Sequence, residues 1–463
     1  MKMKNSGRYT FALLVTLFAT SFTFPGVQRK AAALTVKSLN VINAEVAIDT
    51  SYYGNYRITA NHLLGIDRFI TDDGRIAMLF SDYSTGIVRR LFADTNDRFV
   101  MGPGFNTATP AELTLTFIKD SRGRVTGVSL RNAQGVDQFA QRVVLREERV
   151  SFKNTDANLE GTLLIPSTKG PHPAIILLHG SGPLTRYSFG PYPHFFTSLG
   201  FAVLIYDKRG AGSSSGTRMD ASTGASMKNS LYPDELAGDA LAAMQKLQKH
   251  KDIDPGKIGF WGSSEGGMLS MQVAARSPKI AFAINSSGFM EPLWQTFRYQ
   301  ARAIPQSKGL SPAEIDADSA FVDLWLEVAR TGNHWEDFEK GQKRFNDVGQ
   351  SWIFQSRGPF TSLEQLRWDW NHILTFDPLL ALAKVHCPVL GVFGELDPLT
   401  PALRTSENMR RVLTKAGHKD FTFNIFPQAG HSLSILPEKN RMAPDLFKTL
   451  RTWLLARIRV AEK

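Results

Sequence analysis

The feature that most constrains this chain is an alternation of short apolar runs with helical stretches, which begins near residue 149. Six runs are almost continuously apolar and of strand length: AIILLHG, FAVLIYD, KIGFWG, IAFAINS, PVLGVFG and FTFNIFP. Stretches with helical periodicity, such as PDELAGDALAAMQKLQKH, separate them. Apolar strands that alternate with helices are typical of parallel sheets buried on both faces. The sequence therefore predicts an α/β fold, with a mostly parallel sheet and helices on both faces, over residues 147–463.

A long insertion interrupts the alternation, and we expect a helical cap over about 289–380. Ser311, Pro312 and Glu314 form a helix-start signal, with a capping box and proline at the first helical position. Six of the eight tryptophans lie in the insertion: Trp294, Trp325, Trp335, Trp352, Trp368 and Trp370. They are compatible with a lid over an apolar pocket or with the insertion's own core, and the sequence leaves both open.

The preceding segment, residues 34–146, has a different pattern. Four runs of strand length, RIAMLF, IVRRLFA, ELTLTFIKD and RVTGVSL, are separated by turn signals such as DDG and SRG. This pattern predicts a small antiparallel β-domain. Its lone histidine, His62, is expected to be structural.

The first 33 residues are expected to be a secretory signal peptide. Lys2, Lys4 and Arg8 precede an uncharged apolar run, Thr10 to Phe24, and small residues at Ala31 and Ala33 fit a cleavage site. The protein is then exported, to the periplasm or the medium. The apolar run is shorter than the roughly 20 residues that span a bilayer, so an uncleaved anchor is the less favoured alternative.

Charge and cysteine content exclude other classes of function. The formal net charge is +11, but five of the positive charges lie in the expected signal peptide, and the remaining +6 is scattered. Scattered charge is typical of a solvated surface, so we expect no nucleic-acid partner. No segment after residue 33 has a transmembrane pattern, so we expect no stable membrane insertion after signal cleavage. Cys387 is the only cysteine, which excludes an internal disulfide.

The segment GFWGSSEGGM places two adjacent serines between an expected strand and an expected helix. Only one register fits G-x-S-x-G, and it puts Ser264 at the centre, between Gly262 and Gly266. In such a turn the central serine is held in a strained conformation with its hydroxyl exposed. Ser264 is therefore the candidate nucleophile. The alternative is that Ser264 only caps the helix that follows.

A serine nucleophile needs a base, and the base needs an acid that orients it. Asp397 lies in the loop after PVLGVFG, and His431 lies in the loop after FTFNIFP. Because parallel strands end at the same edge of a sheet, the two side chains are expected to meet there. Glu395 is the rival acid. The sequence therefore predicts a triad of Ser264, Asp397 and His431.

From about Arg149 onward, the chain resembles the α/β-hydrolase superfamily. The motifs HGSGP, YDKRGAGSS and GSSEGG resemble those of bacterial esterases related to dienelactone hydrolase and prolyl oligopeptidase. The resemblance implies the same triad, backbone N–H groups of Ser181 and Glu265 as oxyanion donors, and the insertion as a cap. It also implies structural roles for Asp207 and Arg209.

These features predict a serine esterase that acts on a small-molecule ester and needs no cofactor and no metal. A peptidase of the same fold is the first alternative, because Glu291, Glu327 or Glu336 could hold a substrate amino group. A non-catalytic binding protein on this fold is the second. The glycine-rich turn after YDKRG lacks the spacing of a dinucleotide site and is expected to be structural. The sequence leaves the oligomeric state and the acyl length open.

Overall fold

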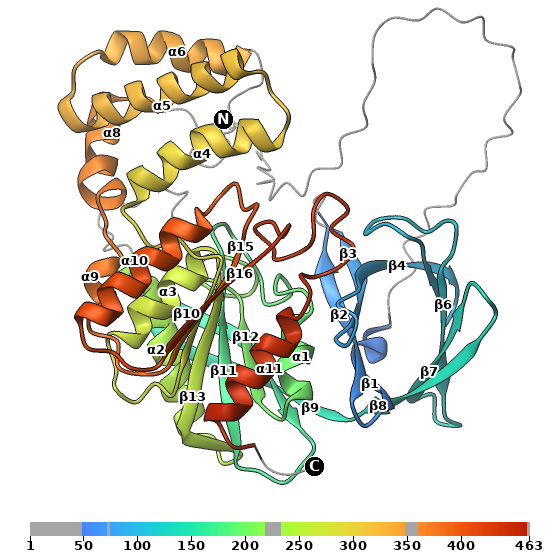
Figure 1. Ribbon diagram of the computed structural model, residues 1–463. Helices are drawn as coiled ribbons and strands as arrows, with labels where there is room; N and C mark the ends of the chain where they lie inside the picture. Colours follow the sequence, from blue (N-terminus) through green and yellow to red (C-terminus); the bar gives the residue numbers. More distant parts are fainter. Residues whose placement is uncertain (1–48, 72–74, 218–232, 348–359, 461–463) are drawn as a thin grey trace, which may run out of the picture.

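The structure, a computed structural model, describes residues 49–71, 75–217, 233–347 and 360–460 (Figure 1). The expected signal peptide, residues 1–33, lies outside the described residues, and so does Trp352. Within the described part of the chain, no helix combines the length and the apolar character needed to cross a membrane.

The N-terminal domain is a closed antiparallel barrel that follows a short 3-10 helix, η1 (Thr50–Tyr52). Strand β1 (Gly54–Thr59) pairs with both β2 (His62–Ile70) and β8 (Asp137–Val143), which closes the barrel. The strands between them are β3 (Ile76–Asp82), β4 (Val88–Thr95), β5 (Arg98–Met101), β6 (Leu113–Lys119) and β7 (Val125–Asn132). The expected antiparallel β-domain is confirmed, with its own aromatic core.

The second domain is built on an eight-stranded sheet with the order β16-β15-β14-β13-β11-β12-β10-β9. Strands β9 and β10 are antiparallel to their neighbours, and the other pairings are parallel. The strands are β9 (Leu145–Asn154), β10 (Ala157–Pro166), β11 (His172–Leu178), β12 (Ala202–Tyr206), β13 (Ile253–Ser263), β14 (Ala283–Ser286), β15 (Val389–Gly394) and β16 (Phe421–Phe426). Each of the six apolar runs coincides with most or all of one of these strands or lies within it, so the predicted α/β fold is confirmed.

Helices cover both faces of this sheet (Figure 1). On one face, α1 (Tyr192–Ser198) and α11 (Leu446–Arg457) share a buried apolar cluster with alternate strand residues. On the other face, α2 (Asp234–Gln248), α3 (Glu265–Ala274) and α10 (Ala402–Lys415) share a second cluster. The absence of polar alternation in the strands follows from this burial on both sides.

The insertion forms a helical cap, drawn in yellow and orange at one end of the sheet in Figure 1. Its elements are α4 (Leu293–Ser307), α5 (Pro312–Thr331), α6 (Trp335–Asp347), α8 (Leu363–Asp369), the π-helix η3 (Trp370–Leu374) and α9 (Leu379–Leu382). The capping box between Ser311 and Glu314 is present at the start of α5. Trp325 is fully buried against Phe297 and Phe360, so this tryptophan packs the cap's own core.

Candidate active site

Ser264 lies in the turn between β13 and α3 and has a left-handed backbone, with φ 57° and ψ −121°. A non-glycine residue with positive φ is strained unless its surroundings enforce the conformation. Here the turn is tight: a Cβ on Gly262 would lie 1.9 Å from the carbonyl oxygen of Gly266. A Cβ on Gly266 would lie 2.2 Å from the carbonyl oxygen of Leu178. Both glycines are therefore needed for strand and helix to approach.

The neighbouring serine has a different environment. Ser263 is the last residue of β13 and belongs to the regular sheet, paired with Ser286. Ser264 precedes the first helical residue, but its side chain makes no capping hydrogen bond. The geometry thus does not match the alternative in which Ser264 serves as a helix cap. Its strain instead presents the hydroxyl at the carboxyl end of a parallel strand.

Asp397 and His431 meet at the same edge of the sheet. Asp397 follows β15, His431 follows β16, and the Nδ1 atom of His431 lies 2.7 Å from Oδ2 of Asp397. The other carboxylate oxygen of Asp397 accepts hydrogen bonds from the backbone N–H groups of Leu399 and Thr400, at 2.8 and 3.0 Å. Asp397 is 1% exposed, so the carboxylate is buried and held from both sides.

The rival acid is placed elsewhere. Glu395 is exposed, and its carboxylate accepts a hydrogen bond from the backbone N–H of Gln428 at 3.1 Å. Glu395 therefore stabilises the loop that leads to His431, and the imidazole ring of His431 is contacted by Asp397.

The carboxylate of Asp397 also sets the protonation of His431. Burial disfavours the charged imidazolium, but the negative charge of Asp397 and its hydrogen bond outweigh burial and raise the pKa of His431. This bond occupies Nδ1 and so fixes the ring tautomer, which leaves Nε2 as the nitrogen able to accept a proton.

The loop after β11 lies beside Ser264. A Cβ on Gly180 would lie 3.4 Å from the Cβ of Ser264, and Ser181 follows directly in this loop. Glu265, the other expected oxyanion donor, is the first residue of α3. The structure therefore brings the two expected donors to the loop and the helix start that flank Ser264.

His179, at the start of the same loop, is unsuited to act as a base. It is buried, its Nε2 atom contacts the carbonyl oxygen of Thr185 at 3.1 Å, and its ring packs on Phe189. Burial, with the nearby positive charge of Lys208, lowers the pKa of His179 to about 3. Its geometry fits the expected role of supporting the loop.

Two further residues near the site, Lys208 and Tyr299, are not predicted from the sequence. The ammonium group of Lys208 lies 2.5 Å from Oε2 of Glu265 and donates to the carbonyl oxygen of Gly180 at 3.0 Å, so it ties the loop to α3. From the cap, the hydroxyl of Tyr299 donates to the backbone carbonyl of Asp397 at 2.6 Å. The aromatic spacing of α4 marks a buried helix face, but nothing in it identifies this partner.

Of the three acidic residues considered for a substrate amino group, Glu291 is fully buried and already paired. Its carboxylate receives two hydrogen bonds from Arg404, at 2.6 and 2.8 Å, and one from Thr296 at 3.3 Å. Glu327 and Glu336 lie on α5 and α6. The position of Glu291 therefore weakens the peptidase alternative.

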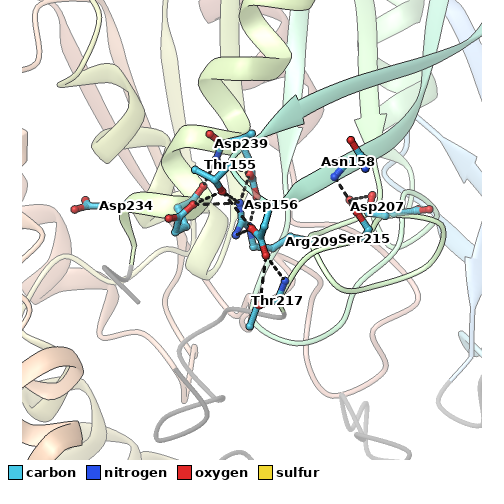
Figure 2. A network of polar contacts seen from close by, with 12 residues as sticks. Thr155, Asp156, Asn158, Asp207, Arg209, Ser215, Thr217, Asp234 and Asp239 are labelled. Carbon is cyan, nitrogen blue, oxygen red and sulfur yellow. Dashed lines mark hydrogen bonds and ion pairs between the residues drawn. The ribbon is translucent and has the colours of Figure 1, made fainter. Parts of the chain in front are cut away.

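Figure 2 shows a polar network around the glycine-rich turn. The fully buried guanidinium of Arg209 forms two hydrogen bonds of 2.7 Å with Asp239 and also contacts Asp156. Asp207 pairs with Arg186 and accepts the N–H of Ser213. Most backbone N–H groups of the turn are bonded within the protein, so the turn has few left to cradle a phosphate. The geometry fits the structural roles expected for Asp207 and Arg209.

Residues 173–437, more than half of the chain, match the family described as "alpha/beta hydrolase fold". A 31.7 kDa Escherichia coli protein of uncharacterised function is 26% identical over 260 residues, which are 54% of this chain and 82% of that protein. The esterase EstD of Thermotoga maritima is 30% identical over 173 residues, which are 36% of this chain and 39% of EstD.

Solved structures give matches of lower identity. An esterase of Pyrococcus furiosus is 16% identical, with a TM-score of 0.42 over 67% of this chain and 90% of that one. An acylaminoacyl peptidase of Pyrococcus horikoshii is also 16% identical, with a TM-score of 0.43 over 84% of this chain and 55% of that one.

Proposed function

Because the chain belongs to the alpha/beta hydrolase fold family, we propose that it is a serine hydrolase that cleaves carboxylic esters through an acyl-enzyme. The observation that carries the proposal is the strained turn at Ser264, set at the same sheet edge as the Asp397–His431 pair. The similarity to a protein named as an esterase supports the choice of ester over peptide.

In the proposed reaction, Oγ of Ser264 attacks the ester carbonyl carbon while Nε2 of His431 takes the hydroxyl proton. The oxyanion that forms is held by the backbone N–H groups of Ser181 and Glu265. His431 then returns the proton to the leaving alcohol. Water attacks the acyl-enzyme with His431 again as the base, which releases the acid and restores Ser264. Asp397 orients the ring and stabilises the imidazolium.

A fluorophosphonate probe tests the nucleophile. We expect the wild type and Ser263→Ala to be labelled and Ser264→Ala to lose both labelling and nearly all turnover. Ser263→Ala is the matched control, since it removes a hydroxyl from the adjacent position, at the end of β13. Labelling that persists in Ser264→Ala would exclude this residue as the nucleophile. A wild type that is neither labelled nor active would support the non-catalytic alternative.

Substrate profiling separates the two hydrolase classes. Turnover of p-nitrophenyl esters with little turnover of aminoacyl p-nitroanilides is the expected result, because the buried Glu291 is neutralised by Arg404. The opposite preference would establish the peptidase.

We also propose that the protein is exported, on the strength of the apolar run Thr10 to Phe24 and the basic residues before it. N-terminal sequencing of the mature protein is expected to begin near Leu34. A cytosolic product that retains Met1 would contradict export.

A further inference from the structure

The segment between β16 and α11, residues 427–445, carries His431 and also contacts the barrel. We call it the histidine segment. In Figure 1 this red segment reaches across to the barrel beside β3. The backbone N–H of Met442 donates to the carbonyl oxygen of Gly86 at 2.7 Å, and that of Val88 donates to Asn440 at 3.0 Å. Ile87 and Arg441, between these pairs, form an antiparallel bridge. The β3–β4 turn of the barrel thus pairs with the histidine segment as a short added strand.

A side chain strengthens this contact. The amide nitrogen of Asn440 donates to the backbone carbonyl of Pro103, on the loop after β5, at 2.6 Å. Asn440 therefore joins two separate loops of the barrel to one point of the histidine segment.

The other edge of this short strand, residues 441–443, pairs with residues 433–435, which follow His431 closely in the chain. The N–H of Ile435 donates to Arg441 at 2.9 Å, and the N–H of Ala443 donates to Leu433 at 2.8 Å. The N–H of Gly430 in turn donates to Ser434 at 3.0 Å, which closes a turn around His431. A continuous ladder of backbone hydrogen bonds therefore leads from the barrel to the turn that holds the histidine.

The backbone of the histidine segment is strained at three residues, so its conformation depends on contacts with its surroundings. Gln428, Leu433 and Lys439 have φ values of 56°, 60° and 54°. Left-handed backbone is unfavourable for a bulky side chain such as Leu433, and it persists only where the surroundings over-determine it. Leu433 is 1% exposed and packs in the cluster that contains the barrel residues Leu79 and Val88.

We propose that the barrel is a positioning domain for the catalytic base, and that Gly86 of the barrel and Asn440 of the histidine segment act as positioning residues. By pairing with residues 440–442, the barrel holds the His431 loop where Nδ1 meets Asp397 at 2.7 Å. The inference rests on the proposed function only in treating His431 as the base. The alternative is that the barrel is an accessory module that merely packs against the hydrolase domain.

The barrel offers a matched pair of glycines for the test. Gly86 and Gly123 both occupy barrel turns, with φ values of 76° and 75°. A Cβ at Gly86 would lie 3.3 Å from the carbonyl oxygen of Met442, whereas a Cβ at Gly123 would meet nothing within 4 Å. Gly86→Ala and Gly123→Ala therefore introduce similar backbone strain, but only Gly86→Ala makes a close steric contact with the histidine segment, at the carbonyl oxygen of Met442.

We expect Gly86→Ala to lower kcat by roughly tenfold or more with KM little changed, because small misplacements of catalytic groups are costly. Asn440→Asp, which puts a carboxylate against the carbonyl oxygen of Pro103, is expected to act in the same direction. In both variants, amide exchange of residues 430–436 speeds up. The pKa of His431, followed by NMR, falls toward its ordinary value, because its rise depends on contact with Asp397.

Gly123→Ala is expected to keep the wild-type kcat, amide exchange and histidine pKa. Variants of Gly86 and Asn440 that fold and also keep all three wild-type values would overturn the proposal in favour of an accessory module. So would equal losses in Gly86→Ala and Gly123→Ala, since these would reflect general strain in the barrel. The exchange and NMR readouts need no substrate, so they test the coupling even if the wild type fails to hydrolyse esters.

Discussion

Ser263 and Ser264 carry the same hydroxyl and differ in backbone conformation. Ser263 ends a regular strand, whereas Ser264 has φ 57°. The strain is maintained by contacts that only glycine permits at positions 262 and 266. The proposed reactivity of Ser264 therefore depends on the turn, and a larger residue at either glycine is expected to remove it without changing the serine.

Asp397→Asn should reduce turnover on the order of 10⁴-fold, because an asparagine amide facing Nδ1 favours the wrong ring tautomer. Asp397 raises the pKa of His431, and catalysis needs the neutral ring, so kcat/KM in the wild type rises with pH through that raised pKa. Losing the carboxylate of Asp397 lowers the pKa of His431. The residual activity is therefore expected to keep its plateau to lower pH, as measured by the pH profile of kcat/KM.

Glu395→Gln is the control for this prediction, since the exposed Glu395 serves the backbone of Gln428 and not the ring of His431. It should retain most of the turnover and the wild-type pH profile. If Glu395→Gln abolished activity and Asp397→Asn did not, the assignment of the acid would be reversed.

The residues that could be predicted from the sequence are those whose placement follows from local rules. Ser264, Asp397 and His431 each follow a strand, and parallel strands end at one edge. Lys208, Tyr299 and Asn440 could not be predicted, because their partners lie 57, 98 and 337 residues away in the chain. Such pairings depend on how loops and domains pack against one another, and the periodicity of apolar residues in the sequence does not predict this packing.

At the scale of elements, two patterns identify strands: period-two alternation where one face is solvated, and a continuous apolar run where both faces are covered, as in β11 and β15. A strand that shows neither pattern is not predicted. The alternation of RVTGVSL predicted β7, whose burial alternates over most of its length. Strand β2 was missed because five consecutive residues, Leu63 to Asp67, are buried. Its inward face packs the barrel and its outward face meets α1, so the period of two disappears.

The cap helix α4 contacts, at two points, the loop that follows β15 and holds Asp397, so its position bears on the proposed catalysis. Tyr299 donates to the carbonyl of Asp397, and Gln300 donates to the carbonyl of Leu399 at 2.8 Å. We expect Tyr299→Phe to lower kcat/KM by roughly fivefold, since one hydrogen bond contributes about 1 kcal/mol. The loss should lie mainly in kcat, as measured by steady-state kinetics on a p-nitrophenyl ester.

Tyr52→Phe is the matched control, because the hydroxyl of Tyr52 bonds to Asp97 within the barrel. It should leave kcat unchanged. If Tyr299→Phe raised KM and left kcat unchanged, the hydroxyl would contact the substrate and would not support the loop that holds Asp397.

At the scale of the whole molecule, the barrel and the hydrolase domain share one apolar cluster. Leu79 and Val88 of the barrel lie in the cluster formed by α1 and α11. The ring of Tyr83 lies 5.3 Å from the rings of both Phe195 and Phe447. Continuous burial of this kind makes the two domains unfold together, so we expect a single calorimetric transition for the wild type.

A buried aspartate–histidine hydrogen bond crosses the same interface, and it provides the sharpest test of this coupling. Oδ1 of Asp67 lies 2.6 Å from Nδ1 of His194, with the side chains 3% and 8% exposed. Removing either partner leaves a buried polar group unpaired, so Asp67→Ala and His194→Ala should each destabilise the protein by about 1–3 kcal/mol. The double variant should lose less than the sum, with a coupling energy of about 1–3 kcal/mol.

Calorimetry should then show a separate barrel transition at lower temperature in both single variants, because the broken pair lies between the domains. Asp137→Asn is the control: its partner Arg131 and Asp137 are 62% and 58% exposed, and such surface pairs contribute less than about 1 kcal/mol. Strictly additive losses for Asp67 and His194 would show that the two side chains are not energetically coupled. In that case the apolar cluster and the backbone pairing with residues 440–442 would hold the domains together, and mutations at Leu79 and Phe195 would split the transition instead.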